Sequence, residues 1–337
     1  MDQIYLYGSI SRIPLYNCSE KTSDDWSKDT GQSRPVTGSL QIIYGISVDL
    51  LYIPIALIML EKDMFKTSCF KIMLLLAVID FLIISVNSVL TGFLAIRGAV
   101  YCTHPELIYL SGSVVLALWC SSCFTSLLLV SNRLLKMTRE TLENNIFGGT
   151  RTFMVLAVPL IYGVCFLFTP PLLYNSRRGA WFFDPMIFPD LSPEYENAPH
   201  AVNNFLIVAI TCLLYIPLTF VIRANLNTVN SQSKFQSTRI QVYLQSTLIC
   251  AANQICAIIY VVMNLMPVSP SVEMLGQFLW QFIHGAPAFI YLLLNQMIQR
   301  RFLAKFRALN LVGKKASLSN TNDFSMKRRK ETSNTIA

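Results

Sequence analysis

Two carboxylic acids, Asp49 and Asp80, lie inside long apolar stretches of this chain that hold no other charged residue. A charged side chain at mid-membrane depth costs about 2.5–3.5 kcal/mol on insertion scales, so both acids are expected to face the interior of a helical bundle. They either take part in a conformational switch or, once protonated, only hydrogen-bond helices together. The polar partners available to Asp80 are Asn87, two helical turns along the same face, and the serines Ser85, Ser121 and Ser122.

The remaining reactive side chains form no catalytic or metal-binding pattern. His104, His200 and His284 are scattered, and the sequence contains no H-x-x-E-H or G-x-S-x-G string and no Gly-rich phosphate loop. Cys102, His104 and His200 lack the regular spacing of zinc ligands. We therefore expect a protein that is not an enzyme and has no resident metal or cofactor.

Seven apolar runs must position these side chains. They lie near 38–60, 72–96, 107–131, 152–174, 204–222, 240–266 and 274–298, and none contains a lysine or arginine. A bilayer core about 30 Å thick needs roughly 20 helical residues to cross it, and a helix satisfies its own backbone hydrogen bonds there. The sequence predicts an all-α membrane protein whose seven-transmembrane helix domain covers 38–298.

Charge is distributed unevenly about these runs. With the amino terminus taken as outside, the loops and trailing segment on the opposite side hold 20 of the 27 Lys and Arg residues, whereas 11 of the 19 Asp and Glu residues lie on the amino-terminal side. Positive residues resist translocation, so we predict a multi-pass plasma-membrane protein with an extracellular N-terminus and a cytoplasmic C-terminus. The basic side favours contact with anionic membrane lipids, and nucleic acid is not an expected partner.

Residues 1–37 are polar and lack the apolar core of a cleaved signal peptide, so they are predicted to remain as an extracellular tail. Asn17 begins the one N-x-Ser/Thr sequon of the chain and is the predicted glycosylation site. Among nine cysteines, only Cys18 and Cys102 are expected outside, where they either form one disulfide or both stay free.

Short motifs resemble those of rhodopsin-like G-protein-coupled receptors. Residues 76–80 resemble the L-A-x-x-D string of helix 2, and Asn132-Arg133 stands where that class ends helix 3 with an arginine. Residues 287–291 resemble N-P-x-x-Y with one extra residue and no Asn before the proline.

A closer resemblance runs from about Tyr5 to Leu309. Residues 7–9, 181–185, 200–204 and 280–287 are similar to segments of the nematode serpentine chemoreceptors of class T. This resemblance implies a seven-helix receptor of chemosensory neurons, in their cilia, that binds an environmental small molecule and signals to a heterotrimeric G protein.

The resemblance also implies an activation switch. Its residues would be Asp80, Asn87, Ser122, Asn132, Arg133, Pro287 and Tyr291. In that class the helix 3 arginine is held by a preceding acid and by a glutamate on helix 6, but here Asn132 precedes Arg133 and 223–245 contain no acid. We expect Arg133 to rest against carbonyls or hydroxyls in a weakly latched inactive state, whose basal signalling Asn132→Asp would lower. A sodium ion near Asp80 and Ser122 is a weak further expectation, because Ala286 replaces a ligating Asn.

Aromatic side chains at the outer helix ends either line a ligand pocket or belong to the interfacial belt. The predicted ligand-binding residues are Tyr109, Trp119, Trp181, Phe182, Phe183, Trp280 and His284. The loop 175–203 has no cysteine, so the bridge common in that class cannot hold it, and its run 181–185 either forms a lid or lies flat on the lipid interface. Val115, in place of an aspartate of amine receptors, disfavours a biogenic amine.

After the last span, residues 299–312 are predicted to form an amphipathic, basic helix in the membrane interface. Residues 313–337 are rich in Ser, Thr, Asn and Lys and are predicted to be a disordered cytoplasmic tail. Two other functions stay open, a ligand-gated cation channel and a small-solute transporter with seven helices. A channel of the insect odorant-receptor kind would place the amino terminus inside, and a transporter would show charges on several helices or an internal repeat.

Overall fold

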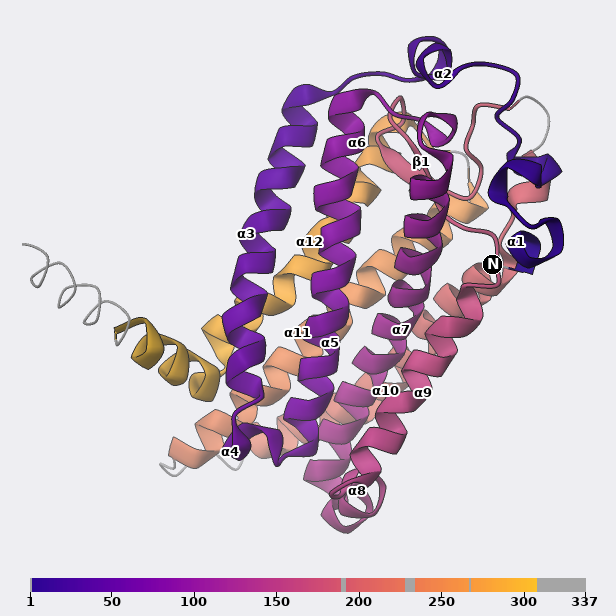
Figure 1. The fold of residues 1–337 in the computed structure, drawn as a ribbon. Coiled ribbons are helices and arrows are strands. Elements are labelled where there is room, and N and C mark those ends of the chain that lie inside the picture. The colour runs from indigo at the N-terminus through magenta and orange to yellow at the C-terminus, as the bar shows by residue number, and fades with distance from the viewer. Residues whose placement is uncertain (1, 189–191, 228–233, 267, 308–337) are drawn as a thin grey trace, which may run out of the picture.

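The computed structural model describes residues 2–188, 192–227, 234–266 and 268–307, and there the framework is a bundle of seven long helical segments (Figure 1). They are α3 (Pro35–Met59), α5 (Ser68–Ile84) continued by α6 (Thr91–Arg97), α7 (Pro105–Thr138), α9 (Arg151–Phe166), α10 (Ala198–Asn227), α11 (Lys234–Leu265) and α12 (Pro270–Leu294). The predicted all-α, seven-helix architecture is confirmed.

Shorter elements join these helices. They are α1 (Asp2–Tyr7), α2 (Ser23–Thr30), α4 (Lys62–Phe65), α8 (Glu140–Phe147), the 3-10 turns η1 (Ile10–Arg12), η2 (Pro14–Tyr16), η4 (Tyr101–Thr103) and η5 (Ser192–Tyr195), the π-helical segment η3 (Ser85–Leu90), and the strands β1 (Leu173–Asn175) and β2 (Ala180–Phe182). Residues 296–307 are also helical, after a break at Asn295. The predicted tail at 313–337 lies outside the described residues.

The helices have the length and composition that a membrane demands. Within the described residues, α3, the stretch 68–97, α7 and α12 are each long and apolar enough to cross a bilayer. The pair α8 and α9, bent by 70°, reaches that length only when it is counted as one broken span. Helices α10 and α11 carry shorter apolar stretches at Ala198–Leu214 and Thr247–Met263. The outward face of α3 exposes Leu40, Ile43, Leu50 and Leu57, as contact with lipid requires.

Prolines set several helix ends. Pro35, Pro105 and Pro270 begin α3, α7 and α12, at a position where a missing N–H leaves no bond unmade.

The predicted span at 152–174 was wrong at its far end. Helix α9 ends at Phe166 because Pro170 and Pro171 cannot continue it, and Leu173–Asn175 pairs instead as a strand.

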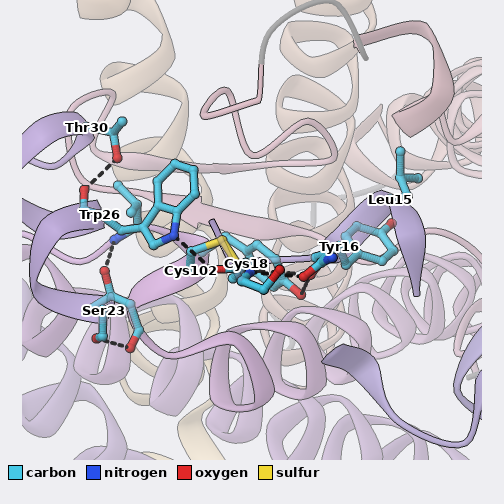
Figure 2. Close-up of a disulfide and its surroundings, with 12 residues drawn as sticks. Leu15, Tyr16, Cys18, Ser23, Trp26, Thr30 and Cys102 are labelled. Atoms are coloured by element: carbon cyan, nitrogen blue, oxygen red, sulfur yellow. Dashed lines mark hydrogen bonds between the residues drawn. A yellow bond between two sulfur atoms is a disulfide. The ribbon is translucent and has the colours of Figure 1, made fainter. Parts of the chain in front are cut away.

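The amino-terminal segment folds over one end of the bundle, which we call the N-terminal end. A disulfide joins Cys18 to Cys102, at the start of α7 (Figure 2). Trp26 donates its indole N–H to the Cys18 carbonyl oxygen at 3.2 Å. Tyr16 is fully buried, and its ring lies 5.2 Å from that of Tyr109. Because these contacts fix the segment, residues 2–34 form a cap on the bundle.

The hairpin β1–β2 adds a second layer to this cap. Its strands pair antiparallel, with Tyr174 opposite Trp181, and a bridge joins Asn175 to Val100. Arg34 ties the amino-terminal segment to the hairpin turn, since its guanidinium donates to the carbonyl oxygens of Ser176 and Arg177 at 2.9 and 2.8 Å.

Small residues let α3 and α6 touch backbone to backbone. A Cβ added at Gly38 would lie 2.5 Å from the carbonyl oxygen of Gly92, and a Cβ at Gly92 would clash with the carbonyl of Gly38. Close approach of this kind drives helix association in lipid, where burying apolar surface gives no advantage.

We predict that Gly38→Ala destabilises the protein by about 1–3 kcal/mol through this overpacking. In an ordinary helix interior the same change would stabilise by about 1 kcal/mol. The measurement is the melting temperature of the detergent-purified chain, with Ser39→Ala, at the exposed neighbouring position, as the control. A melting temperature that stays level or rises for Gly38→Ala would contradict the close approach.

Candidate functional site

A cavity of about 630 Å³ opens at the N-terminal end, beneath the hairpin and between α7, α10, α11 and α12. Five of the predicted ligand-binding residues lie on its wall: Trp119, Trp181, Phe182, Phe183 and Trp280. Tyr109 and His284 do not line it. Sequence reasoning missed His200, Tyr260 and Met263, which also line the cavity.

Aromatic rings form the inner part of the wall. Trp119 and Trp280 flank Tyr260, with ring centroids 6.3 and 6.4 Å from it. Both indoles also contact the ring of His284, at 5.6 Å for Trp119 and 6.5 Å for Trp280. A molecule resting on these indoles would therefore be one ring away from His284.

The hairpin covers the cavity and is fixed to the bundle. Trp181 is buried, and its indole N–H donates to Thr91 Oγ1 at 2.8 Å. Arg178, in the hairpin turn, pairs with Glu273 of α12 at 3.1 Å. Of the two alternatives for the run 181–185, the cover over the cavity agrees with the structure, and the position flat on the lipid interface does not fit Trp181.

A chain of hydrogen bonds runs behind the cavity wall. Tyr162 of α9 donates to Asn203 Oδ1 at 3.0 Å, and Asn203 Nδ2 donates to Asn204 Oδ1 at 3.1 Å. Asn204 Oδ1 also accepts the indole N–H of Trp119 at 3.2 Å, and Asn204 Nδ2 lies 3.3 Å from His200 Nε2. These bonds orient His200, whose ring also packs against Phe183 at 5.0 Å.

Below the cavity, Asp80 forms a buried pair with His284. His284 Nδ1 lies 2.7 Å from Asp80 Oδ1, and both side chains are almost completely inaccessible. The Tyr52 hydroxyl donates to the His284 carbonyl oxygen at 2.5 Å and lies 3.3 Å from Asp80 Oδ2. Three helices, α3, α5 and α12, thus meet at one carboxylate. His284 does not line the cavity, because its ring turns inward to Asp80.

The other predicted partners of the acids are differently placed. Ser85 donates to Asp49 at 3.0 Å, so Asp49 lies at the contact of α3 with η3. Ser121 donates to the carbonyl oxygen of Pro159 at 2.6 Å. Ser122 is buried near Asp80, yet its hydroxyl makes no hydrogen bond within the described chain.

Asn87 contributes through its backbone. It lies in the π-helical segment η3, where the helical register changes, and its carbonyl oxygen accepts from Gln277 Nε2 at 2.9 Å and Gln281 Nε2 at 2.6 Å. Its buried side-chain amide has no partner among the described residues. Asn87 is therefore a contact between η3 and α12 rather than a partner of Asp80.

The surroundings of Asp80 do not fit a sodium ion well. A sodium site needs several oxygen ligands, whereas the carboxylate here faces the imidazole nitrogen of His284 and the Tyr52 hydroxyl. Among the described residues, Ser122 Oγ and the Tyr291 hydroxyl are unpaired oxygens in this part of the bundle. In the part of the chain that the structure describes, no three His, Cys, Asp or Glu side chains cluster as metal ligands.

At the opposite end of the bundle, Glu143 is the residue that sequence reasoning missed. It belongs to α8 and is only 4% exposed. Its carboxylate accepts from Ser68 Oγ at 2.7 Å and Asn132 Nδ2 at 2.9 Å, and it lies 3.5 Å from Lys136 Nζ. Asn132 therefore holds an acid of the neighbouring helix, and an aspartate at this position would face a second carboxylate.

Three of the predicted switch residues remain. Arg133 Nη2 is 3.9 Å from Met73 Sδ. That Arg133 also rests against carbonyls or hydroxyls stays a prediction. Pro287 lies inside α12, and Tyr291 is fully buried with a hydroxyl that has no partner among the residues described.

The helical residues 296–307 attach to the same end through charge. Lys305 Nζ lies 2.7 Å from Glu61 Oε1, and Arg301 pairs with the same carboxylate. These two cations hold the pKa of the Glu61 carboxyl below its usual range. No sequence motif indicated Glu61, because its partners are distant in the chain.

Comparison with known proteins agrees with this geometry. A protein-family model described as "Serpentine type 7TM GPCR chemoreceptor Srt" matches residues 3–315. Serpentine receptor class T-55 of Caenorhabditis elegans is 29% identical over 298 residues, which cover 87% of this chain and 80% of that relative. The class T resemblance is confirmed, and the chain belongs to the Srt family of serpentine seven-transmembrane chemoreceptors.

Proposed function

We propose that this chain is a G-protein-coupled chemosensory receptor. Its N-terminal end faces the exterior, its outer cavity binds an environmental small molecule, and its opposite end signals to a heterotrimeric G protein. The observation that carries the proposal is the contact of Trp119 and Trp280, on the cavity wall, with His284, which pairs with Asp80. By family analogy the protein would lie in the cilia of sensory neurons.

The proposed mechanism is a shift between two states. A ligand moves such an equilibrium only by its different affinity for the two states. A molecule packed on the two indoles favours the position of His284 in which the indoles make the best contact with the molecule. His284, Asp80 and Tyr52 join α12, α5 and α3. A movement of His284 therefore shifts these three helices relative to one another, also at the end of the bundle opposite the cavity.

Orientation is supported by three features. The opposite end carries most of the basic residues, and the disulfide and the sequon both lie at the N-terminal end. Asn17 is exposed there. A channel or transporter finds no comparable support in the described helices.

We predict that Asn17 carries a glycan in cells. Asn17→Gln should abolish the electrophoretic mobility shift that a glycosidase produces in the wild-type protein. Surface staining of an amino-terminal tag on intact, unpermeabilised cells provides the control for orientation. A tag that is reached only after permeabilisation would overturn the proposed topology.

We predict that Trp280→Ala weakens the response to an agonist about tenfold or more, because a buried aromatic contact of about 1.4 kcal/mol or more is lost. The measurement is a reporter screen with a small-molecule library in cells that supply a G protein. Phe282→Ala is the matched control, since Phe282 lies on the same helix and is 59% exposed. Arg133→Ala should abolish the response at an unchanged surface level.

The outcome that contradicts the proposal is a ligand response that survives Arg133→Ala. An ion current evoked by ligand without any G protein would favour a channel. An equal loss of potency in Trp280→Ala and Phe282→Ala would remove the cavity from the mechanism.

We predict that Glu143→Ala raises basal signalling, because it removes the two hydrogen bonds that hold α8 to Ser68 and Asn132, each of about 1.5–3 kcal/mol for a charged acceptor. Asn132→Asp should also raise basal signalling, since it places the new carboxylate next to that of Glu143. This prediction replaces the lower basal signalling that the sequence alone led us to expect. Glu140→Ala is the control, because Glu140 pairs with the same Lys136 but its side chain is 67% exposed. Basal reporter activity per surface receptor tests this, and activity in Glu143→Ala no higher than in Glu140→Ala would contradict it.

A further inference from the structure

Two polar groups on the cavity wall are buried without a partner among the residues described, His200 Nδ1 and Trp280 Nε1. The side chains that carry them are only 6% and 3% exposed. An unpaired buried polar group costs about 1–3 kcal/mol, so each is a place where a ligand can gain affinity by supplying the missing bond. What the ligand must offer depends on whether each group donates or accepts.

The answer for Trp280 is immediate, because an indole nitrogen only donates. For His200 it follows from the hydrogen bonds behind the wall. The indole of Trp119 must donate to Asn204, so the atom of Asn204 that it meets is the oxygen, as the bond from Asn203 Nδ2 also requires. The other terminal atom of Asn204 is then its amide nitrogen, which donates to His200 Nε2.

A ring nitrogen that accepts carries no proton, so the proton of neutral His200 is on Nδ1. Both unpaired groups are therefore donors. The first hydrogen bond of this network agrees with the assignment, since the Tyr162 hydroxyl donates to Asn203 Oδ1 at 3.0 Å. The network fixes one tautomer of His200, a residue of the cavity wall, whose unpaired N–H is at Nδ1.

The charge of the wall restricts the ligand further. The carboxylates of Glu196 and Glu273 line the cavity beside one guanidinium, Arg178, which pairs with Glu273. This excess of negative charge opposes an anionic ligand. The rest of the inner wall is aromatic or apolar, with Trp119, Tyr260 and Met263 among its members, so most of the ligand surface meets hydrocarbon.

We propose that the cavity selects neutral, largely apolar molecules that carry a hydrogen-bond acceptor, such as a ketone or ester, whose oxygen accepts from His200 Nδ1 or Trp280 Nε1. This inference rests on the proposed function only in taking the cavity as the ligand site. It concerns binding and does not depend on G-protein coupling.

The test uses four probes of equal chain length on the full-length, detergent-purified protein: 2-octanone, octane, octylamine and octanoate. Binding is measured by competition or by the shift in melting temperature. 2-Octanone is expected to bind about threefold to tenfold more tightly than octane, the gain from a net hydrogen bond of about 0.5–1.5 kcal/mol. Octanoate should bind more weakly than the ketone because the wall has an excess of negative charge, and octylamine because an ammonium group cannot accept a hydrogen bond from either donor.

Variants separate a lost donor from a damaged fold. Trp280→Phe and His200→Phe each remove one N–H and keep a ring, so they should reduce the preference for ketone over alkane while octane affinity stays within about twofold. Phe282→Ala should leave the preference unchanged. A structural defect would weaken the binding of 2-octanone and octane together and leave the ratio of their affinities unchanged.

A wild-type protein that binds octane as tightly as 2-octanone, binds octylamine or octanoate most tightly, or fails to bind the ketone at all overturns the inference. A preference that both donor variants retain overturns it as well. Ketone binding without any reporter response would leave this inference standing and count against the proposed signalling function, so the two can fail separately.

Discussion

The pairing of Asp80 with His284 is the interaction on which the rest of this bundle depends. A carboxylate inside a membrane protein needs a partner, and insertion scales put the cost of a lone charge at about 2.5–3.5 kcal/mol. The imidazole at 2.7 Å supplies that partner from α12, and Tyr52 supplies a second contact from α3. Since removing one member of a buried pair leaves an uncompensated group, the three helices are held in one relative register.

This pair also explains why the cavity and the core are not independent. The ring of His284 is edge-on to both Trp119 and Trp280, and both indoles belong to the cavity wall. The imidazole therefore contacts the two indoles on one side and the Asp80 carboxylate on the other. Packed interiors of this density do not deform continuously, so a displacement of either indole requires a new position for the imidazole. At the far end, Glu143 holds α8 against α5 and α7 by the same principle, an acid satisfied by donors from neighbouring helices.

Sequence patterns predicted the fold because the membrane makes few alternatives possible. Seven apolar runs without lysine or arginine and a one-sided excess of basic residues determine the number of helices and the expected orientation. Helix ends and the contacts of single polar side chains were harder to predict from the sequence. The break after Phe166 follows from Pro170 and Pro171, which the apolar run concealed. His284 was assigned to the pocket because its place within a helix gives its depth but not its rotation, and Glu143 was missed because a loop acid carries no signal until its partners are known.

Several of the buried polar groups without a partner among the described residues belong to the cavity wall or to the core of the bundle. His200 Nδ1 and Trp280 Nε1 are at the cavity, His284 Nε2 and Ser122 Oγ are near Asp80, and the Tyr291 hydroxyl is further along α12, all without partners among the described residues. Most buried polar groups in proteins are paired, so a concentration of exceptions needs a cause. Each unmade bond raises the free energy of this arrangement by about 1–3 kcal/mol, and a second arrangement that made two of them would be close in free energy. Such a small difference between states is what a weakly bound environmental molecule needs if its contact with two indoles is to change the state of the whole bundle.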